Sequence, residues 1–108
     1  MKLQVHSIHF DADQKLVNFI QKKINKLETF YDRLLDGEVF LRLNNEGIEN
    51  KTVEIKLNVP GTQLFATEKA RTFEAAADQA ADALCMQLKK FKTKVRNRKG
   101  LHSVQPTP

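Results

Sequence analysis

The chain is poor in the residues that stabilise small secreted proteins. It contains no tryptophan and only one cysteine, Cys85, among 108 residues. A single cysteine cannot form a disulfide within the chain, which fits a reducing cytosol. The first ten residues lack the apolar run of a signal peptide, and no segment approaches the about 20 apolar residues of a membrane-spanning helix. We therefore expect a cytoplasmic protein that makes no membrane contact.

Acidic residues are missing from the C-terminal part of the chain. Residues 1–85 carry eleven Lys and Arg against thirteen Asp and Glu, a net charge of −2, whereas residues 86–108 carry seven Lys and Arg and no acid. A nearly neutral body with a basic end is typical of proteins that bind polyanions, although a basic helix end exposed to solvent is the alternative interpretation.

Catalytic signatures are absent from the sequence as well. It shows no glycine-rich phosphate loop, no cluster of metal ligands and no evident pairing of a nucleophile with a base. An enzyme is therefore the least favoured class of function. We expect no catalytic residues, no cofactor and no metal site.

The stretch from Thr72 to Lys99 is predicted to be one long amphipathic helix with Thr72 as its N-cap. Its apolar stripe consists of Phe73, Ala77, Ala80, Leu84, Leu88, Phe91 and Val95. Its last eleven residues hold seven cations, which is more than the helix dipole needs at its C-terminal end. These charges repel one another, so we expect an external polyanion to bind them. Gly100 is expected to end the helix, and residues 100–108 are expected to form a disordered tail.

Before this helix, the sequence predicts a strand, a helix and three further strands. The first strand is Lys2–Phe10, with a bulge at Ser7. The helix runs from an N-cap at Asp11 or Asp13 to about Tyr31. Its apolar stripe is Leu16, Ile20, Ile24, Leu27 and Tyr31, its opposite face carries Lys15, Lys22 and Lys26, and Lys23 lies beside them. After a turn at Asp36-Gly37, strands are expected at Val39–Leu43, Val53–Val59 and Gln63–Lys69, with a turn at Pro60-Gly61.

This order, β-α-β-β-β-α, predicts an α+β fold with two layers. The first crossover makes strands one and two parallel, and short turns make the last three strands antiparallel, which gives a four-stranded mixed sheet. Both helices should cover its single apolar face, so that their lysines point outward together. Phe40 lies on the exposed face beside Arg42 and Lys56. We expect it to be a partly buried edge aromatic rather than a platform for stacking RNA bases.

Several short motifs occur in one order along residues 1–99. They are KLETFYDRL at 26–34, VFLRL at 39–43, VPG at 59–61, FEAAAD at 73–78 and QLKK at 87–90. Together they resemble the ribosome hibernation promoting factor family, which includes the ribosome-associated inhibitor and was historically labelled a sigma-54 modulation protein. The resemblance implies the same fold, related to double-stranded RNA-binding domains. It also implies binding in the mRNA and tRNA channel of the small ribosomal subunit during stationary phase or stress, where the protein blocks translation and keeps ribosomes idle.

The resemblance also implies partners and contact residues. The expected partners are the small ribosomal subunit with its 16S rRNA and other hibernation factors, and the protein is expected to be a monomer off the ribosome. Long family members carry a further dimerisation domain, so this chain resembles a short form with residues 1–99 as the ribosome-binding domain. The family often has a pattern like K-L-x-R-Q-L where this chain reads Ala83-Leu84-Cys85-Met86-Gln87-Leu88, so we expect the contacts to move one or two turns along the helix. The candidate RNA-binding residues are Lys22, Lys23, Lys26, Lys89, Lys90, Lys92, Lys94, Arg96 and Arg98.

Two other classes of function stay open at this stage. A general double-stranded RNA-binding module would share the fold and the charge, but such proteins place their key lysines at the N-terminal end of the last helix, which is acidic here at Glu74 and Asp78. A protein-binding transcription regulator follows from the older family label. It predicts binding that persists after nuclease treatment.

Overall fold

The elements of the chain follow the predicted order. The computed structural model describes the backbone of residues 1–44 and 47–100, and the side chains of these residues up to Thr93. The elements are β1 (Lys2–Ile8), α1 (Gln14–Phe30), β2 (Asp36–Leu43), β3 (Lys51–Val59), β4 (Thr62–Ala70) and α2 (Phe73–Gly100). α2 extends to Gly100, the residue expected to end it, so Gly100 belongs to the helix instead of the tail predicted for residues 100–108, and the remainder of that tail lies outside the described residues.

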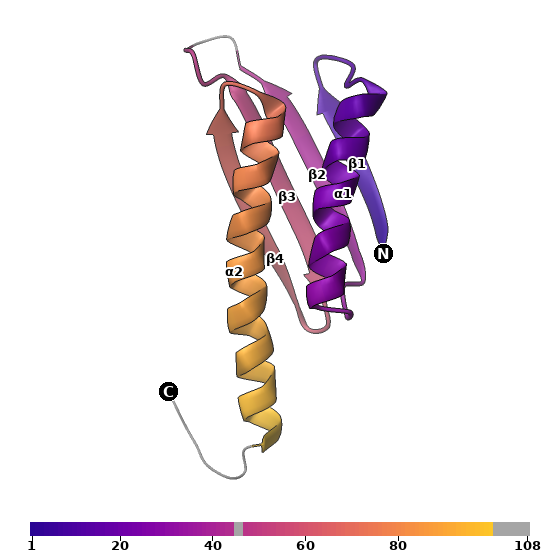
Figure 1. Cartoon of the computed structure of the whole chain (residues 1–108), viewed down its shortest axis with the longest axis vertical. Helices are drawn as coiled ribbons and strands as arrows, with labels where there is room; N and C mark the ends of the chain where they lie inside the picture. The colour runs from indigo at the N-terminus through magenta and orange to yellow at the C-terminus, as the bar shows by residue number, and fades with distance from the viewer. Residues whose placement is uncertain (45–46, 101–108) are drawn as a thin grey trace.

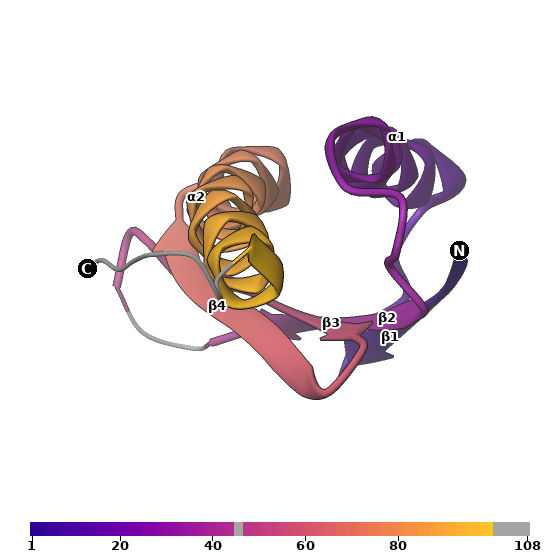
Figure 2. The same ribbon diagram turned by 90° about the horizontal axis from the view of Figure 1, so that it is seen from below.

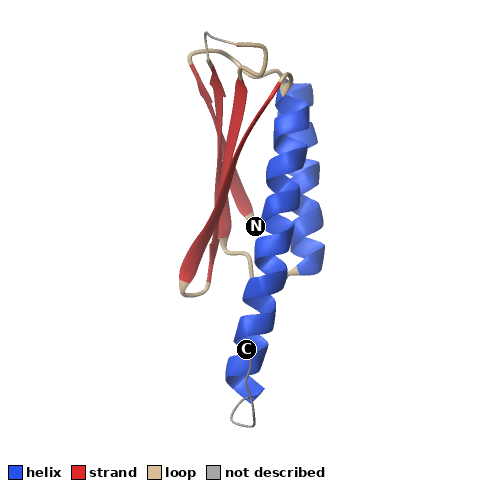
Figure 3. Ribbon diagram, turned by 90° about the vertical axis from the view of Figure 1, so that its left-hand side faces the viewer, coloured by secondary structure: helices blue, strands red, loops and turns tan. Residues whose placement is uncertain are grey.

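The four strands form one mixed sheet in the order β1-β2-β3-β4 (Figure 1). β1 pairs parallel with β2, and β2, β3 and β4 pair antiparallel in sequence. Both helices cover the same face of the sheet (Figures 2 and 3). The predicted two-layer α+β architecture is therefore confirmed.

The core lies between the sheet and the two helices. All five residues of the predicted stripe on α1 are buried, and Val53, Ile55 and Leu57 of β3 are fully buried by alternation along the strand. The first half of α2 buries mainly alanines, and β4 also contributes Ala66 and Ala70. Because these side chains are short, α2 can approach the sheet closely, and it packs over β4 and β3.

The first strand is shorter than the sequence suggests. β1 ends at Ile8, because His9 adopts a left-handed conformation (φ 69°) that turns the chain away from the sheet. Phe10 therefore lies outside the strand and stacks on Phe73, with ring centroids 4.9 Å apart. The predicted bulge at Ser7 is wrong, since Ser7 pairs with Leu41 in an unbroken register.

The predicted turn at Asp36-Gly37 is also wrong, because both residues belong to β2. Gly37 is buried where three strands meet closely. A Cβ atom there would lie 2.8 Å from Leu57 Cδ2 and 3.1 Å from the backbone oxygen of Lys56. The glycine therefore serves close strand packing instead of a turn.

The start of α1 offers a direct test of local structure, because the sequence left two candidate caps. Asp13 is the N-cap, and its Oδ1 accepts a hydrogen bond from Leu16 N at 2.8 Å. Asp13→Ala should lower the free energy of unfolding by about 1 kcal/mol, measured by urea denaturation. Asp11→Ala is the matched control and should change it by less than about 0.5 kcal/mol. Equal losses in both variants would contradict the assignment of Asp13 as the cap.

Candidate nucleic-acid interface

The two helices run in the same direction, and α2 is the longer one. Its 28 residues make it about 42 Å long, and it extends past the end of α1 and past the sheet (Figures 1 and 3). The basic residues of α2 begin at Lys89, close to the level at which α1 ends. The hydrogen bond from Lys92 to Phe30, the last residue of α1, shows this level. The fold therefore places the cationic half of α2 at one end of the helix layer.

Four of the predicted RNA-binding lysines are exposed, namely Lys22, Lys26, Lys89 and Lys90. Lys22 and Lys26 lie one turn apart on α1, and Phe30 follows one further turn along the same face. Lys94, Arg96 and Arg98 belong to the described backbone of α2, but their side chains lie outside the described part of the structure.

Two predicted contact residues have partners within the fold. Lys23 forms an ion pair with Asp78 across the two helices, with 2.6 Å between Nζ and Oδ1. Lys92 Nζ donates a hydrogen bond to the backbone oxygen of Phe30 at 3.1 Å. The last carbonyl groups of a helix have no partner within the helix, and a cation there also suits the helix dipole. Lys23 and Lys92 therefore join α1 to α2 in addition to any role in binding.

Phe30, the last residue of α1, was not among the predicted contact residues. Its ring lies beneath two cations of α2, 4.7 Å from Lys92 Nζ and 6.0 Å from Lys89 Nζ. Cations over an aromatic face are attracted by its quadrupole, so Phe30 holds both amines beside the C-terminal turn of α1. The three-residue spacing of Lys89 and Lys92, which places them on one helix face, was the available signal.

The row formed by Lys22, Lys26, Phe30 and Lys89 is termed here the helix row. Its members follow one another on α1 at four-residue spacing and then continue onto α2 through the contact between Phe30 and Lys89. Lys90 lies apart from this row, because it lines a hollow between α2 and β4 instead. The structure thus brings together Lys22, Lys26 and Lys89, and it places Lys90 on another side of α2.

The exposed face of the sheet is organised differently. Phe40 is half-buried in β2, with His6 stacked on its ring at 4.8 Å and the cations of Arg42 and Lys56 at 5.4 and 5.3 Å from its centroid. It is partly buried as expected, but β2 is an inner strand, so the expectation of an edge position is wrong. Its neighbours already surround the ring, which disfavours base stacking there.

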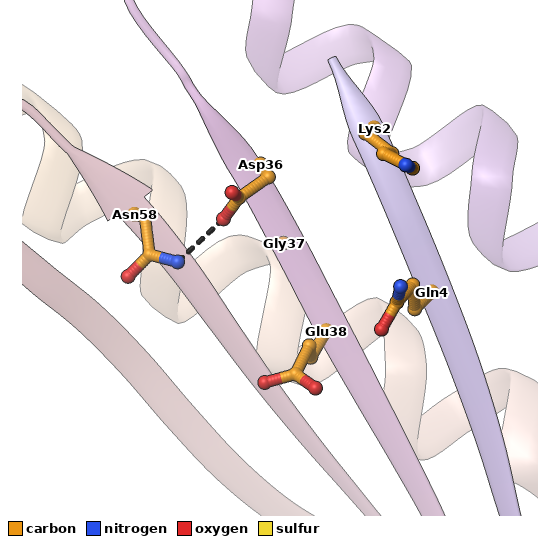
Figure 4. A pocket seen from close by; sticks show the side chains of 6 residues that line it. All are labelled: Lys2, Gln4, Asp36, Gly37, Glu38 and Asn58. Carbon is orange, nitrogen blue, oxygen red and sulfur yellow. Dashed lines mark hydrogen bonds between the residues drawn. The ribbon is translucent and has the colours of Figure 1, made fainter.

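Arg42 and His6 each have an acidic partner on this sheet face. Arg42 forms an ion pair with Glu54 at 3.0 Å, and His6 Nε2 lies 3.2 Å from Glu38 Oε2. A polar hollow of about 200 Å³ lies where β1 and β2 begin and β3 ends (Figure 4). Lys2, Gln4, Asp36, Gly37, Glu38 and Asn58 line it, and Asn58 Nδ2 donates to Asp36 Oδ1. With two carboxylates and one lysine, this hollow does not suit a polyanion.

The described part of the chain contains neither a metal-binding group nor a helix that could cross a membrane. Among those residues, no group of three or more His, Cys, Asp and Glu side chains is placed to hold a metal ion. Neither described helix is both long enough and apolar enough to cross a membrane.

Comparison with known proteins gives one consistent family. The family model described as "Sigma 54 modulation protein / S30EA ribosomal protein" matches residues 3–96. The ribosome hibernation promotion factor of Deinococcus radiodurans is 30% identical over 109 residues, which cover 97% of this chain but only 56% of that protein. The ribosome hibernation promoting factor of Pseudomonas putida is 30% identical over 94 residues, 87% of this chain and 89% of that protein. The crystal structure of the N-terminal domain of Thermus thermophilus Protein Y aligns with a TM-score of 0.74 and 25% identity, covering 84% of this chain and 99% of that one.

The internal contact of Lys92 predicts a difference between neighbouring lysines. Lys92→Ala removes a hydrogen bond to the end of α1 and a cation over Phe30, so the free energy of unfolding should fall by about 1 kcal/mol in urea denaturation. Lys90→Ala is the matched control, since it removes the same charge from the exposed side of α2, and it should change stability by less than about 0.5 kcal/mol. If Lys92→Ala proved as stable as Lys90→Ala, the structural role of Lys92 would be wrong.

Proposed function

The chain belongs to the Sigma 54 modulation protein / S30EA ribosomal protein family, and from that premise we propose that it is a ribosome-binding inhibitor of translation. Curated relatives carry the name ribosome hibernation promoting factor. We propose that this protein binds the small ribosomal subunit in the channel used by mRNA and tRNA, and that it keeps ribosomes idle in the cytoplasm during stationary phase or stress. The 16S rRNA is the proposed direct partner.

The helix row is the observation that carries this proposal. It places Lys22, Lys26 and Lys89 in sequence along one side of the helix layer, close to the start of the basic half of α2. Lysines that neutralise RNA phosphates release condensed counterions, which supplies affinity without reading sequence. Structured RNA is recognised largely by its shape, so specificity would come from the fit of the folded domain to the channel.

The proposed inhibition requires no chemical step. A domain that occupies the path of mRNA and tRNA excludes both ligands for as long as it stays bound. The long α2 suits this role, because its basic half extends beyond the sheet (Figure 3) and could follow an RNA groove without bringing the sheet along. Occupancy then depends on the dissociation rate, which many phosphate contacts lower together.

The predicted contact set divides into two groups under this proposal. Lys22, Lys26, Lys89 and Lys90 are exposed and are the proposed main contacts. Lys94, Arg96 and Arg98 are proposed as further contacts from their positions along α2. Lys23 and Lys92 would contribute less to binding than the other lysines, because each already has a partner in the fold.

Salt dependence of binding to purified small subunits tests this proposal. Binding of the wild type should weaken as salt rises, and co-sedimentation in a sucrose gradient should be lost at high salt. The double variant Lys26→Ala, Lys90→Ala should reduce the slope of log K against log salt by about 2 and weaken binding at low salt.

The matched control is the double variant Lys2→Ala, Lys69→Ala, which removes the same charge from the exposed face of the sheet and should keep the wild-type slope. If the wild-type protein stays at the top of the gradient at both low and high salt, the proposed binding to the ribosome is contradicted. Binding that persists after nuclease treatment of the subunits would favour a protein partner.

A further inference from the structure

A hollow of about 300 Å³ lies between the start of β4 and the second half of α2. Thr62, Leu64, Gln87, Lys90 and Phe91 line it. We propose that it accepts one unstacked base of single-stranded RNA, with the neighbouring phosphate on Lys90. This inference rests on the proposed function, because it takes the RNA to be part of the ribosome that the helix row contacts.

The floor of the hollow is apolar and held in place. Leu64 is half-buried and packs against the core. The Phe91 ring lies edge-to-face on the buried Tyr31, with centroids 5.7 Å apart and an interplanar angle of 88°. An aromatic ring that is already fixed loses little conformational freedom on binding, so it is a good surface for a base.

The rim of the hollow is polar and can meet a base edge. Gln87 Nε2 donates to the backbone oxygen of Phe65 at 2.8 Å, which fixes the amide against the outer edge of β4. Gln87 Oε1 accepts no hydrogen bond from any described residue, and the exposed Thr62 carries a hydroxyl that can donate or accept. Base edges present donors and acceptors side by side, whereas an apolar peptide side chain presents neither. The rim therefore suits a nucleobase better than an aliphatic residue.

The charge around the hollow favours an anionic occupant. The residues that line it, Thr62, Leu64, Gln87, Lys90 and Phe91, include no Asp or Glu. Lys90 is the charged residue among those that line the hollow. An apolar floor next to a cation matches a base with its phosphate. A hollow of this size takes a base only when it is unstacked, as in the single-stranded regions that RNA-binding proteins commonly recognise.

The test is a titration of the isotope-labelled full chain, followed by NMR, with oligouridylate and oligoadenylate hexamers. Inorganic polyphosphate of similar length is the probe that carries charge without bases. The oligonucleotides should shift the Leu64 methyl and Phe91 ring signals, whereas polyphosphate should shift lysine signals only. Thr62→Trp fills the hollow and should weaken oligonucleotide binding roughly tenfold without changing polyphosphate binding. Lys90→Ala should weaken both ligands.

Thr67→Trp is the matched control, because Thr67 is exposed on the same strand but faces the other side of the sheet. It should bind both ligands like the wild type, and thermal denaturation should show both tryptophan variants folded. Unchanged oligonucleotide affinity in folded Thr62→Trp would overturn the proposal. So would equal Leu64 shifts with polyphosphate, or displacement of the RNA from Leu64 by an acidic Glu–Leu peptide. These results are separate from sedimentation with small subunits, so loss of the base site would leave the proposed ribosome binding intact.

Discussion

Both helices must pack on one face of a single sheet, and the rest of the structure depends on that constraint. Each inner strand buries every second residue, so only one face of the sheet is apolar. The helices that cover it must direct their polar faces outward on the same side of the molecule. Lysines separated by more than 60 residues in the chain, such as Lys26 and Lys89, therefore belong to one surface, the helix row. Neither described helix covers the other face of the sheet, and some of its charged side chains pair with one another, as Arg42 does with Glu54.

Most of the fold could be predicted from the sequence because its elements are strongly periodic. The strict alternation of Val53, Ile55 and Leu57 indicated a strand with one buried face, and the stripe on α1 proved entirely buried. The errors lie where a single residue overrides a local pattern. His9 ends β1 through its backbone conformation, and Gly37 looked like a turn residue although close packing against Leu57 is what requires it.

The candidate site was harder to predict than the fold, because charge alone does not distinguish a binding lysine from a structural one. Lys89, Lys90 and Lys92 read alike in sequence, yet they differ in the folded chain. Lys92 bonds to the end of α1, Lys89 approaches the ring of Phe30, and Lys90 borders the hollow beside β4. These differences arise from where α1 ends relative to α2. That offset is a tertiary feature, which the periodicity of either helix alone cannot reveal.

The distribution of charge along α2 explains how a basic surface can coexist with a stable fold. Like charges close together cost free energy, and the cost is smallest where solvent screens them. The acidic first half of α2 packs over the sheet, and there Asp78 neutralises Lys23 of α1. The basic half begins at the level where α1 ends, and α2 continues beyond the sheet toward solvent (Figure 1). Cations that would repel one another in a packed layer are thus carried to an end of the molecule where an external polyanion can offset their repulsion. Lys23 and Lys92 hold the two helices together through Asp78 and the end of α1, whereas the exposed Lys22, Lys26, Lys89 and Lys90 remain available to a ligand.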